Sequence, residues 1–176
     1  MSIERVHRDM SVIHKNKVDT TAPSINKILI PIDKTPLSLK AANYGIHLAE
    51  IEKAKEVVVM HVVEDVKQGG AIGLRAKYGD VKLVEGFKKA KTSSAEEMLR
   101  PIEEEAKKKG VNIKSEIIYA EDKSVVKAIT DYADKNHIDV IVVGGGDVSS
   151  KKYLVIGGSV ANGIVKKSKC PVMVMR

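Results

Sequence analysis

The feature that most constrains the fold is a set of short, nearly continuous apolar runs rich in β-branched residues. They cover residues 27–33, 56–63, 138–143 and 171–175, and a partly alternating run lies at 111–118. A strand that is apolar on both sides needs covering on both faces, as in a parallel sheet flanked by helices. Helical patterns separate the runs, which favours right-handed crossovers. We therefore expect an α/β fold: an open five-stranded parallel sheet of order 3-2-1-4-5, helices on both faces, with 111–118 as an edge strand.

Four helices are expected between these strands. They cover residues 36–53, 93–109, a stretch from 121 or 122 to 136, and 159–169. In the first, the inward stripe is predicted from residues at spacings of four and three: Leu37, Ala41, Tyr44, Leu48 and Ile51. Ser93 is predicted to cap the second helix, and Pro101 to kink or split it. Residues 66–91 are basic and broken by five glycines, so we expect a functional flap or a tolerated surface insertion, with one short helix near 81–87.

Composition narrows the class of protein. The 176 residues contain 43% hydrophobic but only 3% aromatic residues, and the formal net charge is +7. Few aromatic residues leave few stacking platforms, which argues against nucleic-acid binding, whereas an anionic small ligand fits the charge. The single cysteine, Cys170, cannot form an intrachain disulfide, and no apolar run approaches the length of a membrane span. We expect a cytoplasmic protein with residues 1–26 as a mobile or loosely docked arm and residues 27–176 as one domain.

Glycines follow the strand at 138–143 and precede the last helix. The stretch runs through Gly144–Gly146, a polar loop, and then Gly157, Gly158 and Ser159. Glycine lets backbone N–H groups approach an anion closely, and a helix N-terminus adds unpaired donors and a positive dipole end. Asp33 follows the first strand, and in the expected strand order it meets Gly144 where the order reverses, which is where such sheets bind ligands.

These pieces together resemble the universal stress protein family of the UspA type. The matching segments are residues 27–33, 61–62, 139–144, 158–160 and 169–174, in that order. The resemblance implies a Rossmann-like fold related to adenine-nucleotide hydrolases, and an ATP or AMP ligand, with Mg²⁺ carried by ATP near Asp33. It implies that Asp33 and Val62 meet the ribose and adenine, and that Gly144, Gly158, Ser159 and Val160 meet the phosphates. The full set of candidate binding residues is Pro31, Asp33, Val62, Val143, Gly144, Gly146, Gly158, Ser159 and Val160.

The glycine spacing departs from the ATP-binding branch of that family, which has glycine, two residues, glycine, nine residues and then Gly-Ser or Gly-Thr. If Gly144 is the first glycine, Asp147 stands at the second, and ten residues separate it from Gly158. If the count runs back from Gly158, Gly145 is first and Val148 stands at the second. Gly146 can take over only with a shifted loop. Two functions therefore stay open: a nucleotide-responsive regulator, and a dimeric interaction protein with an empty glycine loop.

No catalytic assignment follows from the residues. The chain contains no HExxH, CxxC, GxSxG or Walker A motif, so we expect at most slow ATP hydrolysis and assign no catalytic or metal-binding residue. The short apolar run at 171–175 is expected at a sheet edge, where it invites pairing with a second copy. The family resemblance implies the same homodimer, together with a protein partner that the sequence does not identify.

Overall fold

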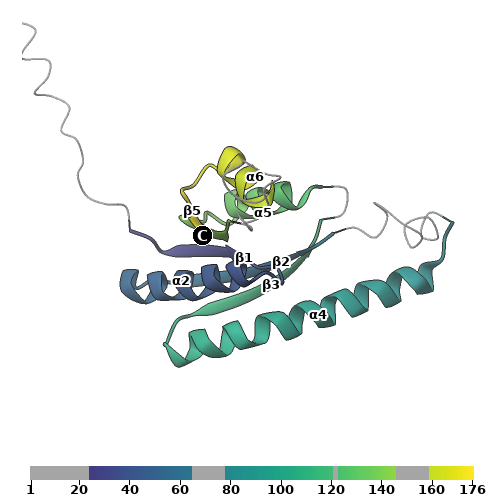
Figure 1. The fold of residues 1–176 in the computed structure, drawn as a ribbon, viewed down its shortest axis with the longest axis horizontal. Coiled ribbons are helices and arrows are strands. Elements are labelled where there is room, and N and C mark those ends of the chain that lie inside the picture. Colours follow the sequence, from purple (N-terminus) through teal and green to yellow (C-terminus); the bar gives the residue numbers. More distant parts are fainter. Residues whose placement is uncertain (1–23, 65–77, 121–122, 146–158) are drawn as a thin grey trace, which may run out of the picture.

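The computed structural model describes residues 24–64, 78–120, 123–145 and 159–176. Its five strands form one parallel sheet of order β3-β2-β1-β4-β5, as predicted, with two helices on each face (Figure 1). The elements in chain order are β1 (Lys27–Pro31), α2 (Pro36–Glu52), β2 (Glu56–Val63), α4 (Val81–Lys108), β3 (Ile113–Tyr119), α5 (Val125–Lys135), β4 (Val140–Gly144), α6 (Ser159–Lys167) and β5 (Val172–Met175).

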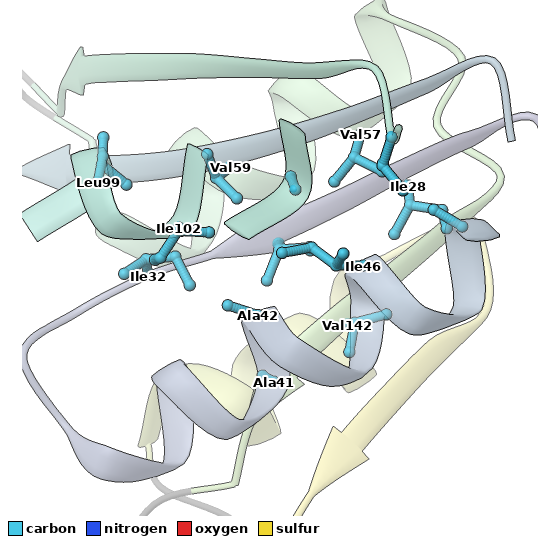
Figure 2. Close-up of a cluster of buried hydrophobic side chains, with 14 of the residues drawn as sticks. Ile28, Ile32, Ala41, Ala42, Ile46, Val57, Val59, Leu99, Ile102 and Val142 are labelled. Atoms are coloured by element: carbon cyan, nitrogen blue, oxygen red, sulfur yellow. The ribbon is translucent and has the colours of Figure 1, made fainter. Parts of the chain in front are cut away.

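The central strands are almost entirely apolar because both of their faces are covered. Alternate residues of β1 lie in different clusters: Ile28 and Ile30 pack under α2 and α4, and Leu29 packs under α5 and α6. Figure 2 shows the first of these clusters. The strands pair in parallel register, with Ile28 beside Val57 on β2 and Val140 on β4. The predicted edge strand, β3, is indeed at one edge, and β5 is at the other.

The predicted inward stripe of α2 is wrong in part. The buried side of this helix is displaced from the predicted stripe around the helix axis, and Ala41 is the residue that the two share. Most of the residues on the buried side are small: Ser38, Ala41, Ala42, Gly45, Ile46 and Ala49. Tyr44 and Ile51 are instead exposed, by 42% and 62%. The reason is close approach to the sheet. A methyl group on Gly45 would collide with the buried side chain of Ile30, so the narrow side of the helix faces the core and the larger residues are displaced to its flank.

The predicted start of the second helix at Ser93 is wrong, whereas the helix expected near 81–87 is present as the first part of a longer one. Residues 81–108 form one helix, α4, whose N-cap is Asp80, with its side chain accepting a hydrogen bond from the Leu83 nitrogen. Pro101 lies inside this helix on its exposed face. There the carbonyl left without a donor can be hydrated, so the proline does not end the helix. Residues 66–77 of the predicted flap lie outside the described part.

The third predicted helix, α5, starts later than expected. Its N-cap is Ser124, whose hydroxyl accepts from the Lys127 nitrogen. The earlier candidates, residues 121 and 122, lie outside the described part of the chain. In α6, Gly163 faces Val126 of α5, and a methyl group there would lie 2.7 Å from a Val126 methyl, so the two helices pack closely. Among the described helices, none is both long enough and apolar enough to cross a membrane.

Candidate functional site

The candidate site lies at the carboxyl edge of the sheet, between β1 and β4. These strands are neighbours, yet β1 continues through α2 to β2 on one side, and β4 is followed by α6 and β5 on the other. The connections therefore leave the sheet in opposite directions, which opens this edge to a ligand. The turn after β1 and the end of β4 meet at this place, as the sequence predicts.

The turn after β1 is held by three short polar side chains. The Asp33 Oδ1 atom accepts hydrogen bonds from the Thr35 nitrogen at 2.9 Å and from the Thr35 hydroxyl at 2.5 Å. Thr35 is the N-cap of α2, and its hydroxyl oxygen accepts from the Ser38 nitrogen. The Ser38 hydroxyl donates to the Asp33 carbonyl oxygen at 2.6 Å. The loop and the first turn of α2 thus form one rigid unit.

Asp33 remains a solvent-accessible carboxylate within this unit. Partial burial would raise its pKa, but the hydrogen bonds from Thr35 and Ser38, with a smaller electrostatic contribution from the nearby His61, outweigh that cost, so the pKa lies below the ordinary value of 3.8. Asp33 is therefore ionised at neutral pH. Its Oδ1 accepts the two hydrogen bonds from Thr35, and because a carboxylate has about four acceptor sites, the exposed group can still accept from an external donor.

Gly144 ends β4 directly against the first turn of α2. A methyl group placed on Gly144 would lie 2.7 Å from the Leu37 carbonyl carbon and 2.8 Å from the Ser38 nitrogen. No side chain fits there, so this glycine brings the β4 backbone next to the unit built on Asp33. The next residue, Gly145, is buried and donates its N–H to the Met175 carbonyl oxygen at 2.7 Å, which extends the pairing with β5.

His61 fastens the ends of β1 and β2 together. Its Nδ1 lies 2.8 Å from the Ile32 carbonyl oxygen. A carbonyl only accepts, so Nδ1 carries the proton and donates, and in the neutral ring Nε2 is an acceptor. The Ile32 nitrogen donates to the Met60 carbonyl at 2.7 Å. The histidine is thus a hydrogen-bonded residue at the rim of the sheet, beside Asp33.

The remaining candidate residues divide into two groups. Val62, Val143 and Val160 belong to the apolar cluster under α5 and α6, and Pro31 is buried at the end of β1. Gly146, Gly158 and the side chain of Ser159 lie outside the described part, as do Asp147 and Val148. The sequence reasoning missed Thr35 and Ser38, although their spacing after Asp33 and the proline at the start of α2 form a capping pattern that was readable.

A metal site is not found among the residues that the structure describes: no group of three or more His, Cys, Asp or Glu side chains there is arranged to hold an ion. Charge between β1 and β4 at this edge includes the Asp33 carboxylate and the N-termini of α2 and α6, which both begin at the carboxyl ends of these strands. Because a helix N-terminus carries a partial positive charge, the Asp33 acceptor lies at an edge with two electropositive helix ends.

Comparison with known proteins decides the family. The family model described as "Universal stress protein family" matches residues 24–176. This chain belongs to the universal stress protein family. Universal stress protein MJ0531 of Methanocaldococcus jannaschii is 31% identical over 150 residues, which is 85% of this chain and 81% of the relative. Universal stress protein YxiE of Bacillus subtilis is 28% identical over 151 residues, or 86% of this chain and 99% of the relative.

Solved structures of the family share the fold. UspA of Lactobacillus plantarum superposes with a TM-score of 0.71 at 24% identity, covering 88% of this chain and 100% of that one. A universal stress protein in complex with cAMP gives a TM-score of 0.62 at 17% identity, covering 88% and 98%. One from Archaeoglobus fulgidus in complex with dAMP gives 0.53 at 18%, covering 88% and 100%. At these identities the structures establish the common fold.

Proposed function

We propose that this universal stress protein binds an adenine nucleotide at the carboxyl edge between β1 and β4 and acts as a stress-response regulator. The observation that carries the proposal is the contact of Gly144 with the first turn of α2, which places the β4 backbone beside Asp33. Two family members of the same fold were solved with cAMP and with dAMP, which supports an adenine ligand.

The chemistry of Asp33 fits a ribose. Its carboxylate is ionised and held in one orientation by Thr35, so its remaining acceptor sites are in place for a sugar hydroxyl. A hydrogen bond to a charged acceptor is stronger than one between neutral groups, by roughly a factor of two. Val62, on the neighbouring strand, supplies an apolar surface of the kind that an adenine ring packs against.

The phosphates would lie between the end of β4 and the start of α6. Residues 159–167 form α6, so the backbone N–H groups of its first turn point toward the edge that holds Gly144. Gly158 directly precedes this helix in sequence and Gly146 comes two residues after the end of β4, and glycine lets a backbone N–H approach an anion closely. Mg²⁺ would arrive with ATP, and Asp33 is the one carboxylate among the candidate residues that could hold it.

The same packing is compatible with the alternative of an empty loop in a dimeric interaction protein. A side chain at Gly144 would collide with the backbone of α2, and one at Gly145 would collide with the end of β5. The packing alone therefore explains why both residues are glycine. The two functions differ in whether an adenine nucleotide stabilises the folded chain. Direct measurement of binding therefore separates them.

The first experiment is mass analysis of the freshly purified, denatured protein for an adenine nucleotide, followed by thermal unfolding of ligand-free protein with ATP, ADP or AMP, with and without Mg²⁺. A ligand at 100 times its Kd adds about 2.7 kcal/mol of stability, which raises the melting temperature by roughly 5–10 °C for a chain of this size. No co-purified nucleotide and no shift with any of the three would reject binding and leave the interaction protein.

A matched pair of variants locates the site. Asp33→Asn keeps a carbonyl oxygen for Thr35 but loses the charge, and we expect the affinity to fall roughly tenfold to a hundredfold, the worth of a hydrogen bond to a charged group. Glu104→Gln removes one charge from an exposed position on α4 and should leave affinity unchanged. Equal affinities of the Asp33 variant and the wild type would place the ribose elsewhere.

We also propose that the chain forms a homodimer through residues 171–175. Their strand, β5, lies at the sheet edge beyond β4, and its residues are half-buried. Charged substitution of Val172 and Val174 should give monomers or aggregates in sedimentation. Because both valines also pack under α5 and α6, circular dichroism must show that the variants are folded. A folded double variant that still sediments as a dimer would contradict this interface.

A further inference from the structure

The flank of α2 carries an apolar surface that the described part of the chain leaves uncovered. Tyr44, Leu48 and Ile51, which we call the α2 stripe, recur at spacings of four and three and so share one side of the helix. Tyr44 is 42% and Ile51 62% exposed, whereas Leu48 reaches the core beneath α2 and α4. Single exposed apolar residues are common, but three in helical register form a surface that another helix can cover.

The described part of the chain begins near the C-terminal end of α2, the end that carries Ile51. The Asn26 carbonyl oxygen accepts hydrogen bonds from the nitrogens of Lys55 and Glu56, just beyond Lys53, the C-cap of α2. Ile25 packs against the core cluster that α2 covers. β1 therefore begins at the end of the sheet where α2 finishes (Figure 1), and the preceding residues start from the end of α2 that carries Ile51.

The sequence of the arm matches the stripe in pattern and in reach. Ile3, Val6, Met10 and Ile13 recur at spacings of three, four and three, the pattern of a helix with one apolar side. The ten residues 14–23 can span up to about 33 Å. The distance along α2 from Lys53 back to Tyr44 is only about 14 Å at 1.5 Å per residue. The tether is therefore long enough to lay such a helix along the whole stripe.

We propose that residues 2–14 form an amphipathic helix that docks on the α2 stripe of the same chain. The docked helix covers Tyr44 and Ile51 with its own apolar side and leaves its polar side, which includes Arg5 and Arg8, in water. An arm of this kind pays ordering entropy on docking, so its binding is weak and reversible. The proposal concerns α2 and the arm alone and stands whether or not a nucleotide binds.

Hydrogen exchange of the full-length, ligand-free protein tests the docking. We expect the backbone amides of residues 5–14 to exchange roughly tenfold or more slowly than those of an unstructured peptide. Ile51→Asp should abolish that protection although it lies outside the arm. Asn43→Asp, which adds the same charge on another exposed side of α2, should preserve it. Ile51 is suited to this test because its exposure lets the variant fold, whereas Leu48 packs against the core.

A reciprocal pair of variants in the arm completes the test. Met10→Asp should abolish the protection, and Ser11→Asp, on the polar side of the predicted helix, should retain it. Unprotected arm amides in the wild type, or protection that survives Ile51→Asp, would overturn the proposal. Protection that falls on dilution together with dissociation of a dimer in sedimentation would overturn docking within one chain and show that a second copy covers the stripe.

Discussion

The substitution Gly144→Ala most directly tests why the end of β4 is glycine. The added methyl would lie 2.7, 2.8 and 2.9 Å from the Leu37 carbonyl carbon, the Ser38 nitrogen and the Leu37 carbonyl oxygen. All three are backbone atoms in the first turn of α2, so no side-chain rotation can relieve the contacts. Either α2 moves away from the sheet or β4 bends.

The size of the effect follows from these distances. The contacts are about 0.5–0.7 Å shorter than an ordinary van der Waals approach of 3.4 Å. Overpacking of a well-packed core costs about 1–3 kcal/mol, and a contact with immovable backbone belongs at the upper end. We therefore expect a loss of about 3 kcal/mol in the free energy of unfolding, equivalent to a fall of roughly 6–12 °C in melting temperature.

The assay is urea unfolding of the nucleotide-free protein, followed by far-ultraviolet circular dichroism. The matched control is Gly86→Ala in the exposed part of α4, where a methyl group meets nothing within 4 Å. Relief of glycine's backbone entropy in a helix should make this control more stable by about 0.5–1 kcal/mol. The two alanine variants should therefore shift the urea midpoint in opposite directions.

A loss below 1 kcal/mol for Gly144→Ala in the nucleotide-free protein would refute the packing argument. If the same variant then lost nucleotide affinity while remaining stable, the glycine would serve the ligand and not the fold. A large loss of stability, in contrast, means that this glycine says nothing by itself about phosphate binding.

Three further outcomes are expected. Gly45→Ala should destabilise the fold by about 1–2 kcal/mol in urea unfolding, less than Gly144→Ala because its obstacle, the end of the Ile30 side chain, can rotate; an unchanged midpoint would contradict the close packing of α2. Asp139→Ala should lower the free energy of unfolding by about 2 kcal/mol, because the Asp139 carboxylate accepts hydrogen bonds from two backbone nitrogens at the start of β1, each at 2.8 Å. A loss under 0.5 kcal/mol would speak against these hydrogen bonds. The Asp33 carboxylate, whose pKa is lowered in the folded state, stabilises the fold above its unfolded pKa of about 3.9. This contribution to stability is lost as the pH falls through the folded pKa, so the stability of the wild type and of Asp33→Asn, plotted against pH, should converge in acid. Parallel curves from pH 7 down to pH 2 would show no such linkage.

Much of the candidate site was readable from sequence because it depends on topology. Strands apolar on both sides, such as residues 56–63, require a parallel sheet with two covered faces. Right-handed crossovers then leave few strand orders, and the reversal between β1 and β4 brings Asp33 and Gly144 to one edge. The roles of Thr35 and Ser38 were less visible, because a capping pattern shows that a helix starts but not which carboxylate it orients.

By itself, the sequence determined the number, kind and order of the strands. A strand that is buried on both faces is apolar along its length, and this can be read without knowing which side chains it packs against. Only the tertiary structure decided which side of α2 faces the sheet and how far α4 extends. The physical reason is that the apolar residues of a helix show how much of its surface is shielded from water. They do not show which of those residues touch the sheet, because that depends on how closely the helix and strand backbones approach. Gly45 and Gly144 allow α2 to lie directly on β1 and β4, and that closeness turns Tyr44 and Ile51 outward.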